Sequence, residues 1–327
     1  MAQMQGMSPV RFTLGNTFTH WVWSPFPLAV LVVLVLIGTW YLRADWLLAT
    51  RGRRWPAGRR ASFFGGLLAI ELAIGSPVAA YTMRYFQAHV IQHLLLMVVA
   101  PPLLALGAPS TLLLQTASRR TKERWLGVLR SSWFALLSHP FTSWFLYFGV
   151  MILFFLTSLI NTAMNHMALM DVINVVFLVG ATLYWWPMVG VDPIIHWKMG
   201  YGARMLNILL GSAIEAFLGV AILAMTHPMA SMYSLSSTHS GGALLWVSTE
   251  VVTLAAFIPI YFQWMRSEDR AAARADARAE RVAAEPANAV PANPSAPRSA
   301  WEAAFFAKAG DLPAVTRASA PGEAPTA

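Results

Sequence analysis

The chain has 327 residues, of which 57% are hydrophobic and only 12% are charged, and it carries a net charge of +8. A soluble domain has about twice that charged fraction, and the mean hydropathy of +0.54 leaves more apolar residues than a soluble core can bury. We therefore expect a lipid bilayer around the chain and no nucleic-acid partner, because basic residues in a membrane protein mark its cytoplasmic loops.

Seven apolar runs along the chain are long enough to cross a membrane, for which a helix needs about 20 mostly apolar residues. The third run contains Pro101, Pro102 and Pro109, so we expect it to kink or break there. The sequence thus predicts an all-α, polytopic membrane bundle with about seven transmembrane helices. The predicted spans are 26–42, 62–81, 88–114, 141–160, 168–188, 205–226 and 242–265.

Basic residues alternate between the loops and so predict which side of the membrane each loop faces. The loops after the first, third and fifth spans hold most of the Lys and Arg, whereas the intervening loops hold Arg84 or no basic residue. By the positive-inside rule, the N-terminus lies outside and the C-terminus in the cytoplasm. Four segments follow: a periplasmic N-terminal segment (1–25), a seven-helix transmembrane domain (26–265), a charged, Ala-rich cytoplasmic helical extension (266–285) and a disordered tail (286–327).

Histidine and methionine are the residues that could bind a soft metal, because the chain has no cysteine. Six of the eight histidines are predicted at or near the outer face, together with several methionines. Thioether and imidazole suit Cu(I) when thiolate is absent. No nucleophile triad, phosphate loop, dinucleotide fingerprint or zinc-protease motif is present, so we do not expect an enzyme.

The sharpest pair is His89 and His93, which lie four residues apart in AHVIQHLLLM and so share one helix face. Met97 continues that stripe one turn deeper. This spacing places two imidazoles where they could bind one metal ion, and ionisable groups inside a membrane are usually functional. The alternative is that both are interfacial caps or are hydrogen-bonded to neighbouring helices.

Further candidate ligands lie in three other outer segments. His166 and Met170 share a helix face in MNHMALMD, where ordinary Met packing is the alternative. His227 lies in the Pro-broken MTHPMASMY and His239 in STHSGG, where a surface loop and helix capping are the alternatives. Carboxylates could orient the imidazoles from behind, as a second layer around the metal. The candidates are Asp171, Glu71 and Glu250, and helix pairing is the alternative for the last two.

The run GSPVAAYTMRYFQAHVIQHLLLMVVAPPLLALGAPSTLLL (75–114) resembles the most distinctive block of the CtaG family of cytochrome c oxidase assembly factors. Further similarities follow in order over most of 25–281: His139-Pro140, NHMALMD, the YWWP segment that begins at Tyr184, Asp192-Pro193 and GGALLWVSTE. The SLSSTHSGG segment departs from the Asp-Gln pair that the family often has there. The prediction that His227 and His239 are metal ligands therefore rests on the chemistry of imidazole and not on the resemblance.

The resemblance implies a multi-pass protein of the bacterial plasma membrane that helps to mature haem–copper oxidases by delivering copper. It implies His89, His93 and His166 as ligands and a copper-containing oxidase subunit as partner. The hypothesis is thus Cu(I) binding at the outer face and transfer by ligand exchange. Three alternatives remain open: a haem protein with two axial His on different helices, a metal or proton transporter that uses Glu71, Glu215 and Glu250, and a scaffold without metal.

Overall fold

The computed structural model describes residues 21–189, 191–193, 196–197 and 199–284, and these residues contain helices and no strand. They form two compact units that divide between Trp264 and Met265. The predicted tail (286–327) and most of the predicted N-terminal segment (1–25) lie outside the described residues, so the proposed division into four segments stays a prediction.

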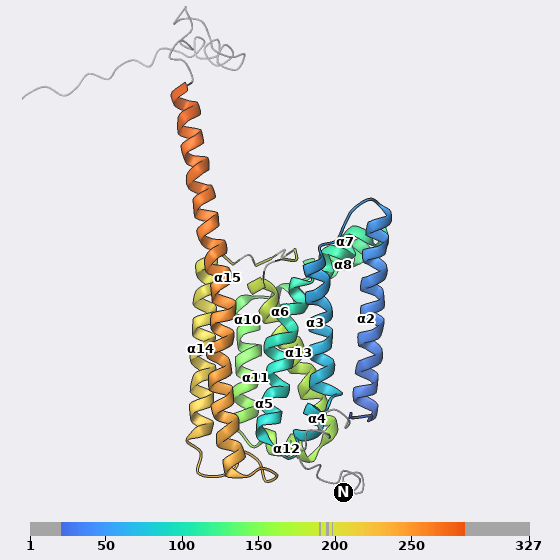
Figure 1. Cartoon of the computed structure of the whole chain (residues 1–327), viewed down its shortest axis with the longest axis vertical. Coiled ribbons are helices and arrows are strands. Elements are labelled where there is room, and N and C mark those ends of the chain that lie inside the picture. The colour runs from blue at the N-terminus through green and yellow to red at the C-terminus, as the bar shows by residue number, and fades with distance from the viewer. Residues whose placement is uncertain (1–20, 190, 194–195, 198, 285–327) are drawn as a thin grey trace, which may run out of the picture. The chain divides into compact units, whose positions relative to one another are not determined.

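Within the described residues, six helices are long and apolar enough to cross a membrane, and a bent helix pair makes up to seven. The all-α, polytopic prediction is therefore confirmed, and Figure 1 shows these helices gathered into a bundle. The spans are α2 (Pro25–Thr50), α3 with α4 (Ala57–Ile74, Pro77–Tyr81), α5 to α7 (Phe86–Leu94, Ala100–Leu106, Pro109–Thr116), α13 (Met167–Val189), α14 (Tyr201–Leu223) and α15 (Leu235–Ala284). The bent pair joins Pro140–Leu156 (α10, η3 and α11) to α12 (Leu159–Asn165) at 78°.

Several boundaries differ from the sequence prediction: the first span ends at Thr50 instead of residue 42, and the second begins at Ala57 instead of residue 62. Side-chain caps explain two further differences. The fourth span ends at Leu156 because the Thr157 hydroxyl donates to the Leu153 carbonyl (2.6 Å) and accepts from the Leu159 N–H (3.1 Å), which caps both helices at the bend. The last span begins at Leu235 instead of residue 242, since the Ser234 hydroxyl accepts from the Ser237 N–H at 3.1 Å. His239 therefore lies inside α15, not in a loop before it.

The two ends of the bundle are built from different residue types (Figure 1). At one end lie α7 and the Arg-rich α8 (Arg119–Arg130), and Arg51 donates to the Gln115 carbonyl there at 2.8 Å. At the other end lie α4 and α12, and the loop before α15 joins them because the Ser231 N–H donates to Asn161 Oδ1 at 3.2 Å. Basic loops and the His- and Met-rich segments thus occupy opposite ends. Which end faces the cytoplasm stays a prediction.

Side chains from neighbouring spans satisfy the backbone carbonyls that prolines leave without a partner. Pro101 has no N–H for the Met97 carbonyl four residues earlier, and the Trp185 indole of α13 donates to that oxygen at 2.9 Å. Pro77 likewise leaves the Ala73 carbonyl free, and Gln92 of α5 donates to it at 2.8 Å. The chain between α5 and α6 adopts one π-helical turn, η2 (Leu95–Val99). These contacts fix the third span against α3 and α13.

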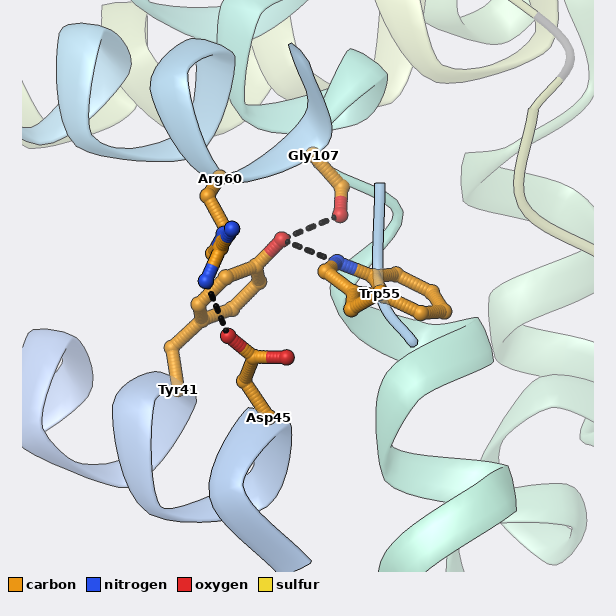
Figure 2. Close-up of polar contacts among 5 residues, drawn as sticks. All are labelled: Tyr41, Asp45, Trp55, Arg60 and Gly107. Atoms are coloured by element: carbon orange, nitrogen blue, oxygen red, sulfur yellow. Dashed lines mark hydrogen bonds and ion pairs between the residues drawn. The ribbon is translucent and has the colours of Figure 1, made fainter. Parts of the chain in front are cut away.

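The expected break in the third span lies at Gly107 and Ala108, where Ala108 adopts a left-handed φ of 50°. Figure 2 shows how α2 holds this break: Tyr41 donates to the Gly107 carbonyl at 2.8 Å and accepts from the Trp55 indole at 2.8 Å. Tyr41 also stacks on Phe63 of α3, with 3.9 Å between the ring centroids. Beside it, Asp45 and Arg60 form an ion pair at 3.1 Å (Figure 2).

Asp192, in the segment after α13, caps the helix that restarts beyond this break. Its carboxylate accepts from the N–H groups of Ser110 (3.1 Å) and Thr111 (2.8 Å) and from the Thr111 hydroxyl (2.6 Å). Burial raises the pKa of Asp192, and these hydrogen bonds oppose that rise. The loop that follows α13 is thereby tied to the N-terminus of α7.

Candidate metal site

His89 and His93 lie on one face of α5, near the end of the bundle where α4 and α12 lie. Both are buried, with 1% and 4% of their surface exposed. Their Nε2 atoms face each other at 2.8 Å, the distance of a hydrogen bond. The i, i+4 spacing explains why the two rings meet, since residues four apart stand one above the other on a helix.

The pair leaves two buried nitrogen atoms without a partner. One Nε2 carries the shared proton, so that ring has a bare Nδ1, and the other ring must carry its proton on Nδ1. Both Nδ1 atoms are buried, and neither makes a hydrogen bond with a residue that the structure describes. An unmade hydrogen bond of this kind costs about 1–3 kcal/mol for each buried group. Such a cost is typical of a site retained for its function.

Aromatic rings from several elements pack against the two imidazoles. His89 stacks with Phe154 of α11 (5.7 Å between centroids) and with Phe86 (6.2 Å), and His93 packs edge-on against Phe177 of α13 at 4.7 Å. Tyr233, from the loop before α15, lies 6.4 Å from His89. The enclosure keeps bulk water away from the imidazole pair.

Phe86 is held over the pair by α15. Its N–H donates to the Ser237 hydroxyl at 2.9 Å. A Cβ on Gly241 would come within 2.2 Å of the Phe86 ring, so only glycine lets α15 pass this close. Gly241, two turns into α15, thereby positions a ring that encloses His89.

A small cavity of about 10 Å³ lies beside the pair and is lined by His93, Met97, Met151, Tyr147 and Glu215. Tyr147 donates to Glu215 Oε1 at 3.1 Å. Met97 is therefore close to the imidazoles, as its place on the same helix stripe predicts. Glu215 was predicted only as part of a transport path and not as a residue of the copper site, although a carboxylate inside an apolar run is a usual sequence signal for a functional group.

The structure does not bring the other candidate histidines into the pair. The exposed His166 ends α12, and its Nδ1 lies 2.9 Å from the Thr162 carbonyl. His227 Nδ1 lies 3.3 Å from the Pro228 carbonyl, and His239 Nε2 lies 2.9 Å from the Met225 carbonyl. In the part of the chain that the structure describes, no three His, Cys, Asp or Glu side chains form a metal-binding group. The roles of His166, His227 and His239 as metal ligands therefore stay predictions.

The predicted supporting carboxylates lie in different surroundings. Glu71 has a buried Oε2 with no hydrogen bond, Glu250 is exposed on α15, and Asp171 lines a second cavity together with Met170. Since each Nε2 atom of the pair bonds the other and each Nδ1 bonds nothing, no carboxylate orients either imidazole in this structure. The supporting role of Asp171, Glu71 and Glu250 thus stays a prediction.

Comparison with known proteins gives the family. The family model described as cytochrome c oxidase caa3 assembly factor (Caa3_CtaG) matches residues 39–267. Uncharacterized protein ML1998 of Mycobacterium leprae (strain TN) is 28% identical over 281 residues, 80% of this chain and 42% of its own length. Uncharacterized protein Mb0105 of Mycobacterium bovis is 28% identical over 286 residues, 82% of this chain and 43% of its own length.

The chain therefore spans less than half the length of these mycobacterial relatives. No solved structure matches it. The family match includes the imidazole pair, the proline breaks of the third span, the Trp185 contact and the glycines that begin the last span. Because that match covers most of the chain, the protein belongs to the Caa3_CtaG family of cytochrome c oxidase assembly factors.

Proposed function

We propose that this multi-pass membrane protein binds Cu(I) at the outer face of the bacterial plasma membrane and transfers it to a copper-containing oxidase subunit. Its family assists oxidase assembly, and haem–copper oxidases need copper delivered to them. The observation that carries the proposal is the buried His89–His93 pair with its two unpartnered nitrogens. The chain offers imidazole and thioether but no thiolate, which is the donor set that suits Cu(I).

The pair must open to receive a metal ion. A metal–imidazole bond is about 2 Å long, so an ion held by both Nε2 atoms would set them about 4 Å apart. They are now 2.8 Å apart, and rotation of the two rings about their Cβ–Cγ bonds is the simplest way to widen the gap. The hydrogen bond between the rings occupies the space that an ion between the two Nε2 atoms would take.

Transfer of the ion requires ligand exchange only, with no covalent bond made or broken in a substrate. Neutral imidazole and thioether ligands exchange readily, which suits delivery better than storage. Met97 lies close to His93 and could accept the ion during the exchange. The partner subunit would supply its own ligands at the outer end of the bundle.

Cu(I) titration of the purified full-length protein tests the proposal. We expect the double variant His89→Leu/His93→Leu to lose one bound Cu(I), or at least about tenfold in affinity, because loss of supporting residues alone costs that much. His196→Leu, an exposed histidine near the other end, is the matched control. In cells, the copper content of the oxidase should fall with the double variant and stay unchanged with the control variant. Unchanged stoichiometry and affinity in the double variant would refute the site.

The haem alternative needs axial His on two different helices, which His89 and His93 on α5 do not supply. Axial imidazoles bind iron from opposite faces of the macrocycle, whereas these two nitrogens are 2.8 Å apart on one helix.

The transporter alternative rests on Glu215, which lines the cavity of about 10 Å³ and a separate cavity of about 20 Å³. Copper or proton flux into liposomes that is lost in Glu215→Gln would support transport over delivery. Normal oxidase assembly in the double His variant would favour the metal-free scaffold.

A further inference from the structure

A cavity of about 90 Å³ lies at the same end of the bundle as the imidazole pair and is lined by methionines from separate segments. Met83 follows α4, Met164 belongs to α12, and Met167 and Met170 begin α13. These segments are up to 87 residues apart in the sequence, from Met83 to Met170, and they meet only in the folded protein. We propose that this methionine cavity is a second Cu(I) site, which receives the ion before His89 and His93. This inference rests on the copper function proposed above.

Polar groups in the cavity favour a cation. Asp171 lies among the methionines with its side chain half-buried, and no Lys, Arg or His of the described part of the chain lines the cavity. Asn174 is only 4% exposed, and among residues 21–284 with their short gaps its Oδ1 finds no hydrogen-bond donor. A buried acceptor without a donor is rare in a folded protein and calls for a ligand or water. A cation near Asp171 and Asn174 would satisfy both groups.

The donor set points to a soft, monovalent ion. Mg²⁺ and Ca²⁺ prefer a shell of oxygen ligands, and structural Zn²⁺ sites use thiolate and imidazole, whereas thioether sulfur selects Cu(I). Methionine also fills irregular gaps in protein cores. Side chains that served only as filler would close the space between them. Here a cavity of about 90 Å³ remains, which is ample for an ion and water.

Tyr233 connects this cavity to the imidazole pair. Its hydroxyl lies 3.6 Å from Met164 Sδ and donates to the Thr82 carbonyl at 2.7 Å, while its ring contacts His89. Gln92, which lines the cavity, precedes His93 on α5. One layer of side chains thus separates the thioethers from the imidazoles. An ion could pass from the more exposed cavity to the enclosed pair by a short displacement.

Two double variants separate the sites. Met164→Leu/Met170→Leu removes two thioethers at nearly constant volume, a change that usually costs little stability. Met188→Leu/Met205→Leu is the matched control, since neither residue lines this cavity. We expect wild-type protein to bind two equivalents of Cu(I), the cavity variant to bind one, and the control to bind two. His89→Leu/His93→Leu should retain the equivalent that the cavity variant loses.

A direct readout is the methyl NMR spectrum of the full-length protein labelled with [methyl-13C]methionine and titrated with Ag(I), a redox-stable substitute for Cu(I). The methyl signals of Met164 and Met170 should shift at the first equivalent in both the wild type and the double His variant. If these signals stay unchanged while the His variant loses copper, the cavity site is refuted and the imidazole site stands. If they shift while the His variant binds copper normally, the imidazole site fails and the cavity site stands.

Discussion

The two buried imidazoles stabilise each other but not the fold around them. Within the described part of the chain, each ring is the only hydrogen-bond partner of the other, and each retains one unsatisfied nitrogen. Replacing one member of a buried polar pair strands the other, whereas replacing both by apolar groups of similar shape is nearly neutral. The pair should therefore show strong coupling in a mutant cycle.

We expect His93→Leu alone to lower the free energy of unfolding by about 1–3 kcal/mol, because His89 then has two buried nitrogens without a partner. The double variant His89→Leu/His93→Leu should be closer to the wild type than either single variant. Chemical denaturation in detergent, followed by tryptophan fluorescence, measures this order. Additive losses in the double variant would contradict it.

A second residue-scale prediction concerns the carbonyl that Pro101 leaves free. Trp185→Phe keeps an aromatic ring but removes the indole N–H that donates to the Met97 carbonyl. Since that oxygen is then buried without a donor, unfolding should become easier by about 1–3 kcal/mol. Trp186→Phe, the neighbouring substitution, is the control, and a thermal melt of both variants compares them. Equal melting temperatures would show that Trp185 does not serve the proline break.

At the scale of elements, small residues set the distance between α3 and α6. A Cβ on Gly66 would lie 2.8 Å from Leu104 Cγ and 3.0 Å from its backbone nitrogen, and a Cβ on Gly107 would lie 2.7 Å from Phe63 Cβ. Close packing through small residues is the usual way in which helices associate inside a membrane. This contact holds η2, and with it Met97, against the rest of the bundle.

Gly66→Ala should therefore push α3 and α6 apart and destabilise the protein by about 1–3 kcal/mol, the usual cost of overpacking. Gly65→Ala is a matched control on the same helix, because its Cβ would meet only Leu103 Cδ1 at 3.5 Å, an ordinary contact. Melting temperatures of the two variants in one detergent give the comparison. A Gly66→Ala protein as stable as Gly65→Ala would mean that the helices can part at no cost.

At the scale of the whole molecule, both copper proposals need the His- and Met-rich end to face outward. The structure places the basic loops together at the opposite end, which agrees with the alternation of Lys and Arg in the sequence. The orientation of the bundle in the membrane is predicted by the positive-inside rule. Contacts within the bundle do not indicate it. It can be measured directly, because the chain has no cysteine of its own.

We expect a cysteine at Met232 to react with a membrane-impermeant maleimide in intact cells, and a cysteine at Arg120 to react only after the cells are opened. Both positions are exposed, and the cysteine-free wild type gives the background. The reverse pattern would place the imidazole pair at the cytoplasmic end. Delivery of copper to an outward-facing oxidase site would then be untenable.

The sequence alone determined the helical spans, the separation of basic from His-rich loops and the shared face of His89 and His93. Each of these depends on local properties: hydrophobic length, loop charge and the helical period of 3.6 residues. It also predicted that the third span breaks, since proline removes a hydrogen bond wherever it stands. The family followed from motifs that are themselves continuous in sequence.

Only the tertiary structure decided which distant residues meet. It brought Met83 to Met170 around one cavity, placed Glu215 next to His93 and left His166 and His227 apart from the pair. The physical reason is that the register between spans depends on side-chain packing and on donors such as Trp185, which must reach a carbonyl 88 residues earlier. No periodicity within one helix contains that information.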